Sequence, residues 1–210
     1  MNHSRRGPLK RVALSVALLA GVFAGVGAFA SQAHASTPLL VKKKTTYTLN
    51  CNTGIANGTV TVKTIQIYPA SVPAGSTFKI KWKSTTTVGG ALASAAYAIA
   101  PGGTEKGTVV LDNDLSTDAT PSPLNIAGTA GIQEQGTISS PSSFPIYTPT
   151  TGKISTPSFT AGSSGTDTVS AQDDNANITI YNSSGQEVTT TTADCTPVGT
   201  PAVIATISVT

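Results

Sequence analysis

Ten carboxylates are the side chains of this 210-residue sequence best suited to act as acids, bases or metal ligands. The two histidines, His3 and His34, both precede residue 36. A mature chain beginning at Ser36 would therefore lack the base of a Ser/His/Asp or Cys/His nucleophile. Glycine-rich dinucleotide and phosphate loops are also absent from the sequence. Carboxylate pairs could still hydrolyse glycosides, but none lies in a recognisable motif, so we expect no enzymatic activity and no cofactor.

Two short acidic stretches carry the oxygen ligands that calcium prefers. Asp112, Asp114 and Asp118 form the first stretch, and Asp173 and Asp174 form the second. Neither has the central glycine and the final glutamate of an EF-hand loop. We expect a solvated turn at each, with a calcium site at the first stretch as the alternative.

Ser76 and Lys79 form an S-x-x-K sequence, which in penicillin-recognising enzymes opens a helix. Here it enters an alternating segment, in which Phe78, Ile80 and Trp82 share one parity. A spacing of three along a strand points two side chains to opposite faces. We therefore expect no catalytic role for this pair and expect Trp82, the single tryptophan, to anchor the core.

The alternate positions of that segment carry three lysines, Lys79, Lys81 and Lys83, which would form a stripe on the other face of the strand. A functional interpretation is contact with an anionic wall polymer or a lipid headgroup. The structural interpretation, which we favour, is that the lysines prevent edge-to-edge association of an exposed strand. Lys42–Lys44 could add to either role.

The first 35 residues have the pattern of an export signal. Basic residues before position 12 precede the uncharged apolar run Val12–Ala30, and Ala33-His34-Ala35 is an A-x-A cleavage site. A retained transmembrane anchor is the alternative, because the run approaches spanning length. Arg5-Arg6 also resembles a twin-arginine signal, but Pro8 stands where that signal prefers an aromatic residue, which favours general secretion. We expect a secreted or cell-surface protein with no membrane span after cleavage.

Removal of the signal changes the charge of the chain. Four of the thirteen lysine and arginine residues precede position 12, so nine lysines, no arginine and ten carboxylates remain. The net charge is then about −1, which argues against a nucleic-acid partner. A cell-envelope polymer, a glycan or a protein is the expected partner, and the oligomeric state stays open.

Cys51 and Cys195 are the two cysteines. An even count in an exported protein predicts a disulfide, with two free thiols or a metal pair as alternatives. Abundant threonine, serine, glycine and valine, with few long helix formers, predict an all-β domain over residues 45–210. Residues 36–44 are expected to be a flexible lead.

Hydrophobic alternation and turn residues divide this domain into many short strands. In the strand over 59–68, the apolar residues change parity, which favours a bulge near Lys63-Thr64, with burial of both faces as the alternative. Residues 88–100 are the one helix candidate. The remaining strands are expected at 46–51, 77–83, 108–111, 124–127, 137–139, 144–147, 158–160, 166–171, 178–181, 187–195 and 203–209. Their number and spacing predict an antiparallel β-sandwich or barrel, and we favour the sandwich.

Four short motifs resemble those of exported actinobacterial proteins of unknown function with an immunoglobulin-like β-sandwich. The motifs are Tyr47-x-x-x-Cys51, Tyr68-Pro69-Ala70-Ser71-Val72-Pro73-Ala74-Gly75, Thr151-Gly152-Lys153 and Asp194-Cys195-Thr196-Pro197. The resemblance covers most of the mature chain and implies a secreted sandwich stapled by a disulfide. It carries over no catalytic residue.

Three functions are consistent with these observations. The first, which we favour, is a non-enzymatic surface protein with a structural, adhesive or binding role. The second is a carrier of an apolar ligand between the sheets, lined by Trp82, Phe144 and Tyr147. The third is a carbohydrate-active enzyme that uses carboxylates. A cavity of ligand size would favour the second, and two facing carboxyls in an open cleft would favour the third.

Overall fold

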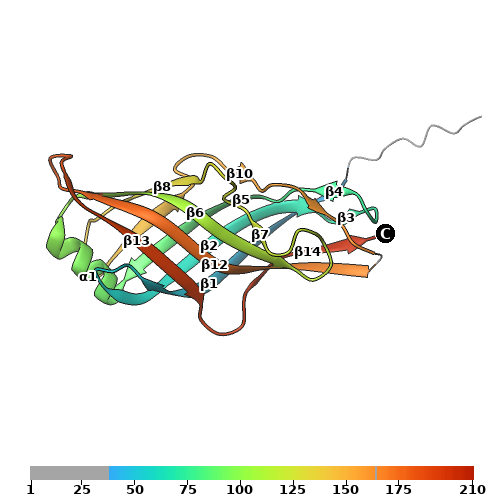
Figure 1. The fold of residues 1–210 in the computed structure, drawn as a ribbon, viewed down its shortest axis with the longest axis horizontal. Helices are drawn as coiled ribbons and strands as arrows, with labels where there is room; N and C mark the ends of the chain where they lie inside the picture. The colour runs from blue at the N-terminus through green and yellow to red at the C-terminus, as the bar shows by residue number, and fades with distance from the viewer. Residues whose placement is uncertain (1–37, 164) are drawn as a thin grey trace, which may run out of the picture. The chain divides into compact units, whose positions relative to one another are not determined.

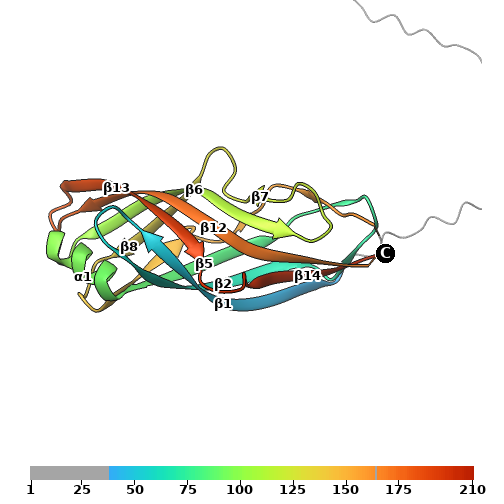
Figure 2. The same cartoon turned by 60° about the horizontal axis from the view of Figure 1, so that its bottom comes forward.

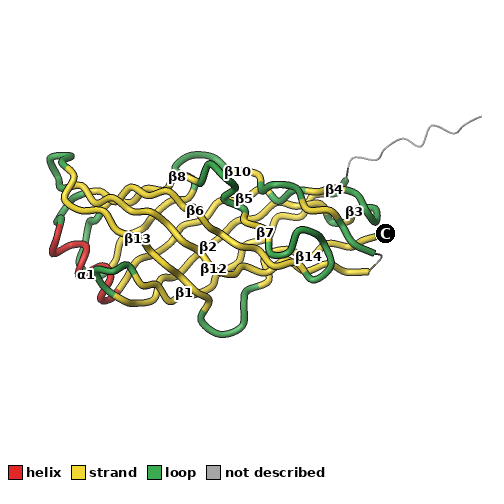
Figure 3. Tube along the Cα trace, viewed as in Figure 1, coloured by secondary structure: helices red, strands yellow, loops and turns green. Residues whose placement is uncertain are grey.

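The computed structural model describes residues 38–163 and 165–210, so the expected signal segment lies outside the described residues. Nearly all of this part of the chain is built from β-strands and the turns that connect them (Figure 3). Within these ranges, no helix combines the length and the apolar character needed to cross a membrane.

Eight antiparallel strands form a closed ring (Figure 1). Around the ring the order is β12, β13, β1, β2, β5, β9, β8 and β6, and β6 pairs with β12 again to close it. Their bounds are β1 Leu40–Asn52, β2 Asn57–Pro69, β5 Lys81–Gly89, β6 Thr104–Ser116, β8 Ile132–Thr137, β9 Ser143–Thr148, β12 Gly165–Tyr181 and β13 Glu187–Pro197. The prediction of an all-β fold is confirmed, but the favoured sandwich is wrong, because the β6–β12 ladder joins the two ends of the sheet into a barrel.

Smaller elements complete the structure. The helix α1, Gly90–Ile99, lies at one end of the barrel, within the predicted range (Figures 1 and 2). Strand β14, Val203–Val209, pairs with the first half of β12, whereas β13 pairs with its second half. Strands β13 and β14 therefore follow one another along the same edge of β12, separated by a loop. The remaining short strands are β3 Ser71–Val72, β4 Thr77–Phe78, β7 Leu124–Asn125, β10 Ile154–Ser155 and β11 Phe159–Thr160.

Residues 40–44 form the first part of β1. Each of them pairs with β2, from Leu40 opposite Pro69 to Lys44 opposite Ile65. The expectation that residues 36–44 are a flexible lead is therefore wrong for these five residues. Two expected strands, at 166–171 and 178–181, are likewise parts of the single strand β12, and the strand expected at 137–139 ends at Thr137 as part of β8.

The expected bulge in β2 is absent from the structure. Strand β2 pairs residue by residue with β1 and with β5, and its even-numbered residues from Val60 to Tyr68 stay inward. Thr64 and Gln66 are buried at two of these inward positions, while Ile65 and Ile67 lie half-buried on the outer face. The apolar residues of β2 therefore change parity because polar side chains occupy two of its inward positions.

A polar layer divides the interior. Phe78, Ile80 and Trp82 are buried in one apolar cluster, and Leu49, Val60 and Phe144 are among the residues buried in another, next to α1. Tyr47 and Ile178 pack against both clusters. The polar side chains that line the interior between the clusters are Thr64, Gln66, Ser84, Asp112, Asp114, Glu134, Thr148 and Asp174.

The disulfide between Cys51 and Cys195 is present, as predicted. The two cysteines lie directly opposite each other in the β1–β13 ladder, with 4.1 Å between their Cα atoms. This ladder pairs only Leu49–Asn52 of β1. The disulfide therefore covalently ties one of the shortest ladders of the ring.

Candidate ligand-binding cavity

A cavity of about 100 Å³ lies inside the barrel at the α1 end. Most of its wall is apolar and includes Leu49, Phe144 and the disulfide. Leu92 and Ala96 of α1 also contribute, so the helix forms part of the wall. The cavity therefore offers an apolar environment that several elements of the fold build together.

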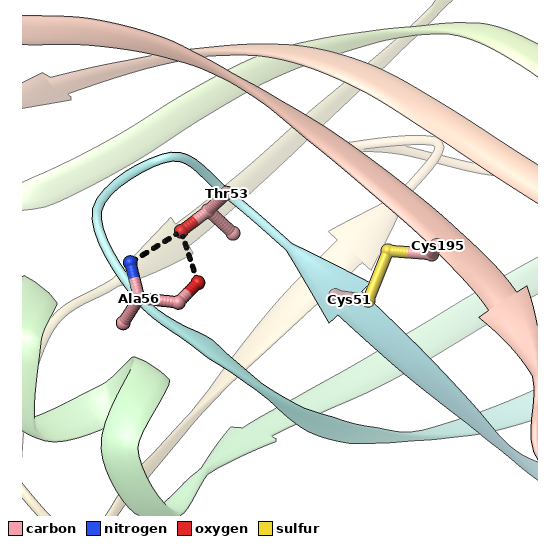
Figure 4. Close-up of a disulfide and its surroundings, with 4 residues drawn as sticks. All are labelled: Cys51, Thr53, Ala56 and Cys195. Carbon is pink, nitrogen blue, oxygen red and sulfur yellow. Dashed lines mark hydrogen bonds between the residues drawn. A yellow bond between two sulfur atoms is a disulfide. The ribbon is translucent and has the colours of Figure 1, made fainter.

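The turn between β1 and β2 lies beside the disulfide and α1 (Figure 4). Its Thr53 hydroxyl accepts a hydrogen bond from the Ala56 amide at 3.2 Å and donates one to the Ala56 carbonyl at 2.9 Å. The Thr191 hydroxyl of β13 donates to the Thr53 carbonyl. Thr53, Ile55 and Thr191 all line the cavity, and Ile55 is partly exposed, so this turn forms its solvent-facing rim.

Two buried glutamates, Glu105 of β6 and Glu134 of β8, face the cavity. In the ladder, Glu105 lies opposite Gly136 and Glu134 lies opposite Gly107, so each carboxylate faces a residue without a side chain. A Cβ atom at Gly107 would come within 2.6 Å of Glu134 Oε1. Gly107 thus leaves the space that the Glu134 carboxylate occupies.

The two glutamates differ in their hydrogen bonds. The Thr148 hydroxyl donates to Glu134 Oε2 at 3.1 Å, across the β8–β9 ladder. Both carboxylate oxygens of Glu105 are buried without a hydrogen-bond partner among the described residues. Buried polar groups without a partner are rare in proteins and destabilising, so Glu105 is a candidate for contact with a group outside the described residues.

Three aspartates extend the acidic group into the polar layer. Asp112, Asp114 and Asp174 line a second cavity of about 20 Å³, together with Trp82 and Gln66. Asp174 also lines the larger cavity. Both oxygens of Asp114, one oxygen of Asp174 and the indole nitrogen of Trp82 are buried, and none has a hydrogen-bond partner within residues 38–163 and 165–210.

Irregularities in β6 and β12 direct these aspartates inward. The inward residues of β6 are Glu105, Gly107 and Val109, but after Val110 the inward parity changes to Asp112 and Asp114. The β6–β12 register shifts at this point and again between Ala171 and Asp174. Such bulges redirect side chains and are common next to functional sites.

The acidic stretches are therefore not the solvated turns that we expected. Asp112, Asp114 and Asp174 lie in strands and face the interior, whereas Asp173 is exposed. Asp118 lies apart from Asp112 and Asp114, in a loop where its carboxylate contacts Gly162. The three ligands of the alternative calcium site are thus not brought together. Among the described residues, no group of three or more histidine, cysteine, aspartate or glutamate side chains has an arrangement suited to a metal ion.

Burial raises the pKa of each inward carboxyl. It is the main cause for Glu105, whose pKa is raised further by the charge of Glu134. The pKa of Glu134 rises to about 7, because burial outweighs the opposing hydrogen bond from Thr148. Burial likewise raises the pKa values of Asp112, Asp114 and Asp174, and neighbouring carboxylates add to the effect for Asp112 and Asp174. Burial, followed by the charges of nearby aspartates, also raises the pKa of the Tyr47 hydroxyl.

No lysine of the described chain places its charge beside these acids. Lys43 is half-buried, but its ammonium group donates to the Val203 carbonyl at 2.7 Å. The other lysines are exposed: Lys42, Lys44, Lys63, Lys79, Lys81, Lys83, Lys106 and Lys153. The interior of the barrel is therefore acidic without a compensating side-chain cation.

The lysine stripe and the S-x-x-K sequence lie away from the cavity. Lys79, Lys81 and Lys83 point outward, opposite Trp82, as the alternation predicted. Lys81 and Lys83 do not guard an edge, however, because β5 has paired neighbours on both sides. The Ser76 hydroxyl donates to the Pro73 carbonyl at 2.6 Å within a turn.

The predicted ligand-lining residues are only partly brought together. Phe144 lines the larger cavity and Trp82 the smaller one, while Tyr147 is half-exposed and lines neither. Sequence analysis missed Glu105, Glu134, Gly107 and Gly136. Glu134 could have been found from the alternation in its strand. Ile132, Glu134 and Gly136 occupy alternate positions, so they share the face that Ile132 predicts to be buried.

Comparisons with known proteins give one distant structural similarity. No protein-family model matches the chain, and no curated protein matches it. A crystal structure described as "Putative membrane anchored protein from Corynebacterium diphtheriae" aligns with a TM-score of 0.48 and 14% sequence identity. The alignment covers 80% of this chain and 38% of that protein, so the chain spans well under half of its length.

Proposed function

We propose that this is an extracytoplasmic binding protein that holds a small, largely apolar molecule inside its barrel. The observation that carries the proposal is the cavity of about 100 Å³ between α1, the disulfide and the strands around them. A carrier function needs such a preformed apolar cavity with a few polar groups in its wall. The disulfide supports an oxidising compartment, in agreement with the export signal.

The size of the cavity limits the ligand. An apolar protein cavity of roughly 150 Å³ accepts benzene, so about 100 Å³ suits a molecule of only a few carbon atoms. Glu105 and Glu134, two carboxyls that face the same cavity, make a carboxylate-dependent hydrolase the second candidate. A sugar ring has too little room there, and for this reason we favour binding over glycoside hydrolysis.

Titration of the disulfide-bonded protein with n-propanol and with n-butanol, followed by NMR, tests the binding function. We expect both molecules to shift the amide signals of cavity residues such as Leu49 and Phe144. Replacement of Ala96 by phenylalanine fills the cavity from α1 and should abolish these shifts. Ala98→Phe, on the exposed side of the same helix, is the matched control and should preserve them. Wild-type protein that binds neither molecule would refute the proposal, and hydrolysis of aryl glycosides that depends on Glu105 would favour the second candidate.

A further inference from the structure

The acidic part of the cavity wall points to the chemical class of the ligand. Glu105 is 3% exposed, and neither of its oxygens has a hydrogen-bond partner among the described residues. Glu134 is 9% exposed, and one of its oxygens accepts a hydrogen bond from Thr148 while the other lies over Gly107. The two side chains thus present several acceptor oxygens and no donor when ionised.

The site is built by the backbone of two neighbouring strands. Glu105 and Glu134 are diagonal neighbours on the inner face of the β6–β8 ladder, and each lies opposite a glycine. Side chains at diagonal positions of an antiparallel ladder are within reach of each other when they are long. A ligand atom between them could therefore contact both carboxylates at once.

The positive charge that would match these carboxylates is not supplied by the part of the chain that the structure describes. Its lysines are exposed or, in the case of Lys43, bound to the Val203 carbonyl. Asp174, the remaining charged residue in the cavity wall, is another acid. Attraction between opposite charges is much stronger in an apolar interior than in water, so a bound cation would gain more here than at the surface.

We propose that the ligand is a small alkylamine, bound as its ammonium ion between Glu105 and Glu134 with its hydrocarbon part against Leu49 and Phe144. This inference rests on the binding function proposed above and names its ligand class. An ammonium group has only donors and forms charge-assisted hydrogen bonds with carboxylates. A hydrocarbon chain of a few carbons suits both the volume and the apolar wall of the cavity.

n-Butylamine and n-butanol form a matched pair that tests the charge separately from the size. At pH 7.5, we expect the secreted protein to bind butylamine at least tenfold more tightly than butanol, as measured by NMR titration. Glu105→Gln should remove most of this advantage while leaving butanol affinity within about twofold. Glu187→Gln, at an exposed position of β13, is the matched control and should change neither affinity.

The outcomes separate the ligand class from the binding function. Equal affinities for the two probes, or an advantage of butylamine that survives in Glu105→Gln, would overturn the alkylamine proposal and leave the binding function in place. A cavity that binds neither probe would overturn both.

A second measurement covers the case in which Glu105→Gln does not fold. Calorimetric titration of the wild-type protein in two buffers with different heats of ionisation reports protons released on binding. At pH 6, below the pKa of about 7 for Glu134, butylamine should release a proton from the glutamate pair and butanol should release none. Binding of butylamine without proton release would contradict the proposal.

Discussion

Glu134 illustrates how its surroundings set the chemistry of a single residue in this barrel. Its carboxyl is held between Gly107, which leaves it room, and Thr148, which donates one hydrogen bond. Burial raises its pKa to about 7, so the protonated form dominates below neutrality. The charged groups that face it are Glu105 from β6 and Asp112 and Asp174 from the β6–β12 ladder.

The free energy of unfolding should therefore fall as the pH rises from about 4.5 to about 7. Because its pKa is higher in the folded state, Glu134 binds more protons there than in the unfolded chain, and unfolding releases protons in this range. Its contribution is fully present below the unfolded pKa and is lost as the pH passes the folded value. The loss is on the order of 3 kcal/mol. Urea unfolding across this pH range measures it.

Glu134→Gln is the variant that isolates this effect. It removes the titrating group but keeps the shape of the side chain, so stability should become less dependent on pH. Glu187→Gln, at an exposed position, serves as the control. A wild-type protein that becomes more stable between pH 5 and 7 would show that the interior carboxyls are ionised in the folded state.

Trp82 is the residue whose role the sequence predicted most directly. It is 5% exposed in the apolar cluster distal to α1, and Lys81 and Lys83 beside it point outward. Trp82→Ala should destabilise the protein by about 3–5 kcal/mol, whereas Lys81→Ala should change stability by less than about 0.5 kcal/mol. Thermal and urea unfolding of the two variants provide the measurement. A Trp82→Ala protein with wild-type stability would contradict the burial of the indole.

The interior acids could not be predicted in the same way. Alternation of apolar and charged residues shows which face of β5 is buried, because burial of the apolar face dominates the free energy there. At Thr64 and Gln66 the inward residues are polar, so the same rule indicated a bulge where none exists. For Asp112 and Asp174, the decisive feature is a register shift between β6 and β12, which depends on strand pairing that one sequence does not reveal.

Among the ladders of the ring, the one between β8 and β9 has the fewest paired residues. Their ladder pairs only Gln135 with Tyr147 and Gly136 with Ile146. Gly136 permits a close approach here, because a Cβ atom on it would lie 2.5 Å from the Pro145 carbonyl oxygen. A backbone oxygen cannot rotate away as a side chain can, so the strands themselves would have to separate.

Gly136→Ala should therefore weaken the β8–β9 ladder. We expect a loss of about 1–3 kcal/mol in the free energy of unfolding, the usual effect of overpacking. Faster amide hydrogen exchange in β8 and β9 would locate the change. Gln135→Ala, whose side chain is exposed on the same strand, is the control. Unchanged amide hydrogen exchange in the Gly136→Ala variant would mean that the β8–β9 ladder accommodates a methyl group.

The first part of β1 has a ladder partner on one side only. Its residues from Leu40 to Thr48 pair with β2 on one side, whereas the β1–β13 ladder begins only at Leu49. Lys42, Lys43 and Lys44 lie in this part of the strand. Lysines on an unpaired edge disfavour association with a strand of another molecule, so the protective role expected of Lys79–Lys83 fits the exposed Lys42 and Lys44 better. Lys43 instead donates to the Val203 carbonyl of β14.

At the scale of the whole molecule, sequence analysis predicted the composition of the fold but not its closure. Most strands, the helix and the disulfide were expected at their observed places. The distinction between a sandwich and a barrel depends on whether β6 pairs with β12. Along most of this ladder, the paired residues are more than 60 positions apart in the sequence. Turn residues and alternation carry no information about such distant partners.

The disulfide should supply much of the stability of the closed barrel. It links residues 144 positions apart, and the chain-entropy model gives about 5 kcal/mol for a loop of this length. Alkylation of the unfolded protein should add no label without a reductant and two labels after reduction, as mass spectrometry would show. Unfolding in urea with and without reductant then measures the contribution. A reduced protein as stable as the oxidised one would mean that the β1–β13 ladder closes the ring without covalent help.

The β1–β13 ladder joins two strands that lie far apart along the chain. A chain emerges from its N-terminus, so β1 is made well before Cys195, which follows Cys51 by 144 residues. Until β13 is available, the ring of strands cannot close. Closure of the ring moves several carboxyls out of contact with water together, and the Cys51–Cys195 bond reports that β1 and β13 have come side by side.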